Sequence, residues 1–139
     1  MDLQGKILLA HGGGGTLTAE LVRELIVPRF GNTALTPLDD AAQLPCPGRR
    51  LAFTTDAFVV SPAFFPGGNI GDLAVCGTVN DLAMAGAEPR WLSLALILEE
   101  GLAVADLAAV LDAAKRRAEE AGVEIVCGDT KVVPKGQAD

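Results

Sequence analysis

Four aspartates in apolar or glycine-flanked surroundings are the residues whose types and spacing point most clearly to chemistry. Asp81 lies within an apolar stretch from Val75 to Ala85, where an unpaired carboxylate would cost several kcal/mol to bury. Asp40 ends an acidic pair, Asp56 lies among strand-forming residues, and Asp129 follows a glycine. For each acid taken alone, a capping or surface residue is the better interpretation, and Asp81 reaches solvent if it lies at a helix end. Together they predict oxygen ligands for more than one Mg²⁺ ion on a nucleoside triphosphate, because each Mg²⁺ takes only one or two carboxylates beside phosphate oxygens and water.

A run of four glycines is the second feature that could do chemistry. It comprises Gly12, Gly13, Gly14 and Gly15, after His11 and before a helical pattern. Such a loop can expose backbone N–H groups to phosphate, although a flexible leader fits the run equally well. The spacing matches neither the Walker loop nor the dinucleotide-binding fingerprint, and no serine- or cysteine-hydrolase signature is present. Lys131, close to Asp129, either neutralises phosphate or faces water.

The charge balance excludes a protein that binds the nucleic-acid backbone. Lys and Arg total 11 against 18 Asp and Glu, a net charge of −7, whereas such a protein needs a positive stripe. The one basic run, Lys115–Arg117, is followed by Glu119 and Glu120, so it is predicted to be a solvated helix face. With half of its 139 residues hydrophobic, the chain is long enough for one domain with a core.

Cysteine usage and the apolar stretches indicate a cytoplasmic protein. The three cysteines are an odd number without C-x-x-C spacing, which disfavours a disulfide framework and a zinc site. The first residues lack the charged start and apolar core of a signal peptide. The longest apolar stretch, 91–98, is far too short to span a membrane. We therefore expect neither a membrane nor a nucleic acid as partner.

The elements that must position these residues are predicted as three helices alternating with three strands, which gives an α/β layered domain. The helices are bounded by capping residues and breakers: Thr18 and Pro28–Gly31 for the first, Asn69 with Asp72 and about Ala85 for the second, Val104 and Gly122 for the third. The predicted strands are Leu51–Val60, Trp91–Leu98 and Val123–Cys127.

The middle strand predicts a homodimer. Trp91, Ala95 and Ile97 lie on one of its faces, and four leucines lie on the other. A strand with one wet face would alternate polar residues. We therefore expect helices on one face and a second subunit on the other.

Several motifs together resemble the aminoimidazole ribonucleotide synthetase superfamily. They are the glycine run, Asp39-Asp40-Ala41-Ala42, Thr54-Thr55-Asp56, the stretch from Asn80 to Ala87, and Gly128-Asp129-Thr130. Within this superfamily the chain is most similar to the carbamoyl dehydratases of hydrogenase maturation, the HypE family. The specific strings are Phe53–Pro62, Phe65–Gly71 and Gly128–Gly136, and the resemblance covers nearly the whole chain.

The resemblance implies an α/β (α+β) fold like the PurM N-terminal domain. Its mixed four-stranded sheet would be covered by helices on one face, and the sheets of two subunits would form a barrel-like dimer core. ATP and Mg²⁺ would lie in a cleft bordered by the partner subunit and by a second domain. The implied metal and phosphate ligands are Asp40, Asp56, Asp81 and Asp129, assisted by Thr55, Asn80, Thr130 and a mobile flap of His11 to Gly15, with Gly12, Gly13, Gly14 and Gly15 at the phosphates. Lys131 and Asp81 would act in the reaction itself.

The implied reaction is the ATP-dependent dehydration of a thiocarbamate on a C-terminal cysteine. It yields the thiocyanate that supplies the cyanide ligands of [NiFe] hydrogenase. Residues 1–139 are expected to be the ATP-binding, dimer-forming N-terminal domain, incomplete at its C-terminal end and without the second domain and cysteine-ending tail. We therefore expect the parent to be an enzyme and this fragment alone to be inactive. The expected partners of the parent are the carbamoyltransferase and the iron-carrying scaffold proteins of hydrogenase maturation.

Three other functions stay open. Selenophosphate synthetase is disfavoured because no cysteine precedes Cys46, where that family carries a reactive residue in its glycine-rich segment. Thiamine-monophosphate kinase shares the aspartates but lacks the string from Lys131 to Gly136. A non-catalytic dimerisation module, the third alternative, would show no Mg²⁺-dependent affinity for ATP.

Overall fold

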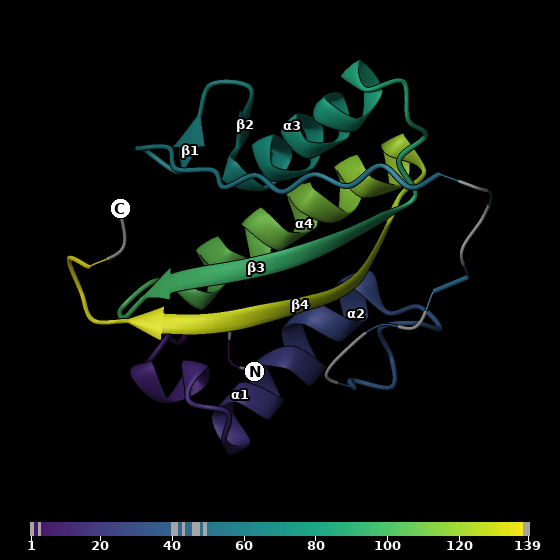
Figure 1. The fold of residues 1–139 in the computed structure, drawn as a ribbon. Coiled ribbons are helices and arrows are strands. Elements are labelled where there is room, and N and C mark those ends of the chain that lie inside the picture. Colours follow the sequence, from purple (N-terminus) through teal and green to yellow (C-terminus); the bar gives the residue numbers. More distant parts are fainter. Residues whose placement is uncertain are drawn as a thin grey trace.

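Two long parallel strands, β3 (Trp91–Glu99) and β4 (Glu124–Val133), form the main sheet (Figure 1). The structure is a computed structural model that describes residues 2, 4–39, 42, 44–45, 48 and 50–137. Helix α4 (Val104–Ala121) connects the two strands, as a parallel pair requires. A β-bulge between Leu92 and Ser93 shifts the register near the start of the ladder. The α/β class predicted from the sequence is confirmed.

The core lies between the helices and one face of this sheet. Leu92 and Leu98 of β3 and Ile125 of β4 are buried there. The inward stripe of α4 is buried as predicted, with Leu111 fully enclosed, and Gly122 ends the helix in the left-handed conformation. Helix α3 (Ile70–Met84) packs along α4 (Figure 1).

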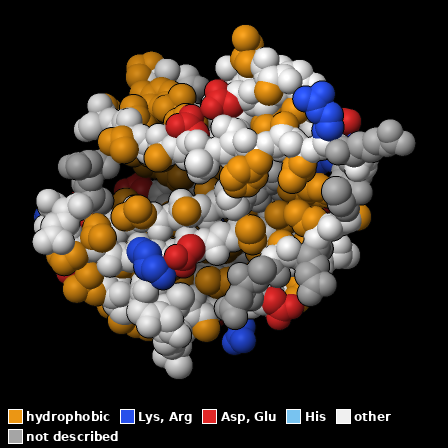
Figure 2. All heavy atoms as spheres, viewed as in Figure 1, with side chains coloured by type: hydrophobic (Ala, Val, Ile, Leu, Met, Phe, Trp, Pro, Cys, Tyr) orange, Lys and Arg blue, Asp and Glu red, His pale blue; other side chains and the backbone are white. Residues whose placement is uncertain are grey.

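The other face of β3 is uncovered in the single chain. Ser93, Ala95 and Ile97 are exposed, and the side chain of Ile97 is 69% accessible. Hydrophobic side chains also gather in several places over the face shown in Figure 2. The helices cover one face of the strand as predicted, and the second subunit expected on the other face stays a prediction.

The first helix is longer than its sequence signals suggest. It comprises α1 (Thr16–Leu21), the π turn η2 (Val22–Ile26) and α2 (Val27–Phe30), preceded by the short 3₁₀ helix η1 (Leu9–Gly12). Its N-cap is Gly15, not the predicted Thr18. Pro28 lacks an N–H and would interrupt a regular α-helix, but the helix continues because the hydrogen-bond ladder has already changed to the π pattern in the preceding turn.

The predicted strand Leu51–Val60 is wrong for the single chain, because residues 51–60 are extended but form no ladder. Strand-forming side chains need a neighbouring strand to bond with, and no described segment pairs with this one. Leu51 and Phe53 are instead 74% and 85% accessible. Within the described residues the main sheet has two strands in place of four, and a separate hairpin joins β1 (Phe64–Phe65) to β2 (Gly68–Asn69).

Strand β4 also differs from its predicted end at Cys127, because it continues to Val133. Gly128, which resembles a strand terminator in the sequence, lies within the ladder. A Cβ at Gly128 would overlap the carbonyl oxygen of Leu94 on the neighbouring strand. Glycine therefore permits the close pairing here, and Asp129 lies inside a strand, not at its end.

None of the helices in the described part of the chain is long and apolar enough to cross a membrane.

Candidate functional site

A cavity of about 430 Å³ lies between the first helix and the sheet. Its apolar lining includes Val22 and Ile26 of the helix together with Leu94 and Leu96 of β3. Its polar lining comes mainly from the glycine loop and β4: Gly12, Gly14, Gly15, Asp129, Thr130 and Lys131. An apolar wall beside a few polar groups is typical of small-molecule sites.

The glycine loop is anchored at both ends. The imidazole Nδ1 of His11 accepts a hydrogen bond from the Leu8 N–H (2.9 Å), and the His11 side chain is buried. The Gly14 N–H donates to Thr18 Oγ1 at 2.9 Å. A Cβ at Gly12 would overlap the backbone nitrogen of Val132, whereas a Cβ at Gly14 or Gly15 would meet nothing within 4 Å. The loop is therefore packed on β4 at Gly12 and open at Gly14 and Gly15.

The β4 residues of the predicted site divide between two environments. Thr130 is buried, while the side chains of Asp129 and Lys131 are 65% and 64% accessible. The Nζ atom of Lys131 lies 3.2 Å from both carboxylate oxygens of Asp129. This hydrogen bond, with a second from the Thr130 backbone N–H, holds the pKa of Asp129 below its ordinary value. Lys131 therefore neutralises Asp129 in the ligand-free chain.

The remaining predicted ligands do not line this cavity. Asp56 and Thr55 are exposed on the extended segment, where Asp56 Oδ1 accepts a hydrogen bond from the adjacent Ala57 N–H at 2.8 Å. Asn80 and Asp81 are exposed near the C-terminal end of α3. Asp81 thus reaches solvent in the single chain, which was the alternative to burial.

The structure describes only one residue, Asp39, of the acidic pair in the predicted site. Asp39 lines the cavity, and Asp40 lies outside the described residues. Among the side chains that the structure describes, no group of three His, Cys, Asp or Glu is arranged to hold a metal ion. One chain therefore brings together the glycine loop, Asp39 and residues 129–131, but not the full set of predicted carboxylates.

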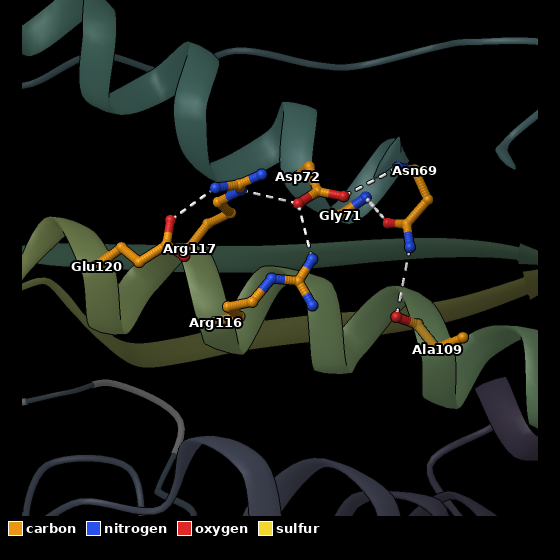
Figure 3. A network of polar contacts seen from close by, with 7 residues as sticks. All are labelled: Asn69, Gly71, Asp72, Ala109, Arg116, Arg117 and Glu120. Carbon is orange, nitrogen blue, oxygen red and sulfur yellow. Dashed lines mark hydrogen bonds and ion pairs between the residues drawn. The ribbon is translucent and has the colours of Figure 1, made fainter. Parts of the chain in front are cut away.

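An ionic network around the buried carboxylate of Asp72, between α3 and α4, was not predicted (Figure 3). Asp72 accepts hydrogen bonds from the Asn69 backbone N–H (2.9 Å), Arg117 Nε (2.8 Å) and Arg116 (3.0 Å). Burial acts to raise the pKa of Asp72, but these hydrogen bonds outweigh it and the pKa is lowered. The sequence does indicate the Asn69–Asp72 capping box, which is confirmed.

Lys115–Arg117 is a solvated face as predicted, with side chains 40%, 55% and 34% accessible, but the sequence does not show that its two arginines also bind a carboxylate. Both Arg116 and Arg117 bond Asp72, and Arg117 also pairs with Glu120 at 2.6 Å. Helical periodicity places these side chains away from the sheet, but it cannot show that the start of a second helix lies within reach of them. Only the packing of α3 on α4 reveals the partner carboxylate.

Comparison with known proteins adds a family and several relatives. Residues 38–139 match the family described as AIR synthase related protein, N-terminal domain. The carbamoyl dehydratase HypE of Rhodobacter capsulatus is 54% identical over 137 residues, which are 96% of this chain and 40% of that protein. A crystal structure of hydrogenase maturation protein HypE in complex with ATP superposes with a TM-score of 0.92 at 52% identity, covering 95% of this chain and 39% of that one.

A third match is a crystal structure of a HypE–HypF complex. It superposes with a TM-score of 0.61 at 48% identity, over 86% of this chain and 38% of that one. The chain thus spans about two fifths of the length of the relatives that it matches.

Proposed function

The chain belongs to the AIR synthase related protein family through its N-terminal domain, and we propose that it is the ATP-binding part of a carbamoyl dehydratase of hydrogenase maturation. The observation that carries the proposal is the superposition on an ATP-bound HypE with a TM-score of 0.92 at 52% identity. The 54% identity to the R. capsulatus carbamoyl dehydratase supports the same activity. The parent protein would be the enzyme, and residues 1–139 would supply its nucleotide-binding and dimer-forming domain.

The described cavity fits a nucleoside triphosphate in the nature of its lining. The loop is open at Gly14 and Gly15, and the Gly15 N–H would donate to phosphate oxygens, whereas the Gly14 N–H already donates to Thr18 Oγ1. The apolar wall of Val22, Ile26 and Leu94 would exclude water from one side of the ligand. Thr130, Gly12 and Gly13 would hold the geometry of the phosphate end.

The carboxylates fit Mg²⁺ only in part within one chain. Asp39 and Asp129 line the cavity, whereas Asp56 and Asp81 are exposed elsewhere. We infer that Asp40, Asp56 and Asp81, with Thr55 and Asn80, complete the metal and phosphate ligands only when a second subunit and a second domain enclose the nucleotide. The exposure of Asp56 and Asp81 supports this, because a carboxylate that must bind a cation is kept out of the chain's own core.

ATP would supply the phosphoryl group that activates the carbonyl oxygen of a C-terminal cysteine thiocarbamate, so that its dehydration gives a thiocyanate. Lys131 would release Asp129 to a metal ion and turn its ammonium group toward developing negative charge. Asp81 would help to orient the phosphate through its bound metal. Positioning and charge neutralisation are what phosphoryl transfer chiefly needs.

Assembly is part of the same proposal. The uncovered face of β3 and the exposed apolar side chains of residues 51–60 would meet their counterparts in a homodimer with a barrel-like core. In the parent, the carbamoyltransferase and iron-carrying scaffold proteins would be further partners, and a solved HypE–HypF complex supports binding to a maturation protein. The free thiols of Cys76 and Cys127 suit a cytoplasmic location.

Isothermal titration with ATP tests the nucleotide site. The full-length protein should bind ATP only weakly without Mg²⁺ and at least tenfold more tightly with it, a gain of about 1.4 kcal/mol or more. Asp129→Asn should remove the Mg²⁺-dependent gain, whereas Asp106→Asn, on the outer face of α4 and away from the cavity, should retain it. No Mg²⁺-dependent affinity in the wild-type protein would instead favour a non-catalytic dimerisation module.

A further inference from the structure

The cavity contains a cation to which the proposed function gives no role. Arg23 lies in the π turn η2 and lines the cavity together with Ala19, Val22 and Ile26 of the same helical segment. It is exposed, so its guanidinium group is not part of the core. π turns within helices occur frequently at functional sites.

Among the described residues that line the cavity, Arg23 is the cation available to a ligand. The charged lining residues are Arg23, Asp39, Asp129 and Lys131. Lys131 already contacts both oxygens of Asp129 at 3.2 Å. No carboxylate of the described residues lies within 4.0 Å of the Arg23 guanidinium. By contrast, Arg29, which is largely buried, pairs with Asp112, and the exposed Arg90 pairs with Glu88.

We propose that Arg23 binds a phosphate group of the ligand directly and is a phosphate-binding residue additional to the glycine loop and Lys131. The planar guanidinium donates two parallel hydrogen bonds to phosphate oxygens, a geometry that an ammonium group lacks. The open backbone of Gly14 and Gly15 lines the same cavity, so phosphate would be held from both the loop and the helix. This inference rests on the proposed function where the ligand is ATP.

Titration of the full-length protein with inorganic triphosphate, ATP and adenosine tests the role of Arg23. Arg23→Gln should weaken triphosphate and ATP by about tenfold or more, the effect of losing one charge-assisted phosphate contact, and should leave adenosine unchanged. The affinity of Arg23→Lys for triphosphate and ATP should lie between those of the wild type and Arg23→Gln, because lysine keeps the charge but lacks the paired donors. Arg90→Gln removes the same charge outside the cavity and should bind all three ligands as the wild type does.

The outcomes separate this inference from the proposed function. Unchanged triphosphate affinity in Arg23→Gln overturns the inference, and so does an equal loss for adenosine and ATP, which would show a general effect on the cavity. If the wild-type protein binds triphosphate but not ATP, the assignment of a nucleotide to the cavity is wrong, whereas the assignment of Arg23 to phosphate binding stands. Absence of binding to any of the three ligands overturns both. Thermal unfolding of each variant checks that the fold is retained, as the exposure of Arg23 predicts.

Discussion

At the scale of single residues, the environment of each carboxylate separates structural from functional aspartates. Asp72 is buried and accepts hydrogen bonds from the backbone N–H of Asn69, the N-cap of α3, and from two arginines of α4. Asp56, Asp81 and Asp129 are exposed, so a cation or water can reach them. A carboxylate satisfied by the protein has little left to offer a metal ion, which is why we assign Asp72 to stability and the exposed aspartates to the ligand.

Replacing Asp72 should therefore reduce stability far more than replacing a surface partner. We expect Asp72→Ala to lower the free energy of unfolding by about 2–4 kcal/mol, because two arginines and a helix N-terminus lose their acceptor. Asp112→Ala breaks the exposed pair with Arg29 and should cost about 1 kcal/mol or less. Urea unfolding of both variants at neutral pH measures the difference, and equal costs would contradict a buried network.

The Asp72 contribution should also depend on pH in a defined direction. Its pKa is lower in the folded chain than in the unfolded one, so its stabilisation is present above the ordinary aspartate pKa and is lost as the pH falls through the folded-state value. The stability gap between wild type and Asp72→Asn should thus narrow between neutral pH and about pH 3. If the stability difference between wild type and Asp72→Asn widens in acid, the pKa of Asp72 is raised in the folded chain and not lowered.

Asp81→Asn tests the exposed aspartates. It keeps the shape of the side chain and removes the charge, so we expect loss of Mg²⁺-dependent ATP binding in the full-length protein. The stability of the ligand-free protein should change by no more than about 0.5 kcal/mol, because Asp81 is exposed. Normal Mg-ATP binding would place the site elsewhere, and unfolding of the variant would make Asp81 a structural residue.

At the scale of elements, the sequence predicts those whose signals are local. The capping box of Asn69 and Asp72 and the left-handed Gly122 mark ends of α3 and α4, and both helices form where expected. The segment 51–60 could not be assigned in this way, because a strand needs a pairing partner that local patterning does not specify. The predicted end of β4 at Cys127 was wrong for a related reason. Gly128 permits the close approach of Leu94, which is a contact between segments far apart in the sequence.

The same limit applied to the candidate site. Local sequence identified the glycine loop and residues 129–131, which do share a cavity. It did not indicate Arg23, because the helical pattern shows which residues share a face but not which face meets a cavity. The resemblance to a family is now confirmed by the match of residues 38–139. That resemblance, and not the structure of the single chain, is the reason to assign the remaining aspartates to the site.

The packing of the glycine loop on β4 predicts that a side chain at Gly12 will lower the stability of the fold. Gly12→Ala would place a Cβ against the Val132 backbone nitrogen, so we expect a loss of about 1–3 kcal/mol in the free energy of unfolding. Gly15→Ala is the matched control, because a Cβ there meets nothing within 4 Å. Chemical denaturation compares them. Equal stability of the two variants would show that the loop does not lie against the strand.

At the scale of the whole molecule, the chain has surface that one subunit does not cover. The open face of β3 and the exposed Leu51, Phe53 and Val59 are apolar, and large exposed apolar surfaces mark interaction sites. The chain also spans only about two fifths of its relatives' length. Both facts are consistent with a domain that works within a dimer of longer chains.

A substitution on the open strand face tests the dimer. We expect the wild-type chain to be a dimer in light scattering at micromolar concentration, with an interface on the order of 2,000 Å². Ile97→Asp should give monomers without unfolding the chain, since Ile97 is 69% accessible in the single subunit. Ala105→Asp adds the same charge to an exposed position on α4 and should remain dimeric. A wild-type chain that is monomeric would reject the dimer.

Mass spectrometry of the full-length protein, carbamoylated on its terminal cysteine and incubated with Mg-ATP, tests the central claim most directly. We predict that the protein loses the mass of one water for each ATP consumed, as the thiocarbamate becomes a thiocyanate. The 139-residue chain should fold and dimerise but yield no thiocyanate, because it spans about two fifths of its relatives' length and so offers only part of the enclosure that excludes water from the phosphates. No loss of water from the full-length protein, or equal activity from the 139-residue chain alone, would contradict the account.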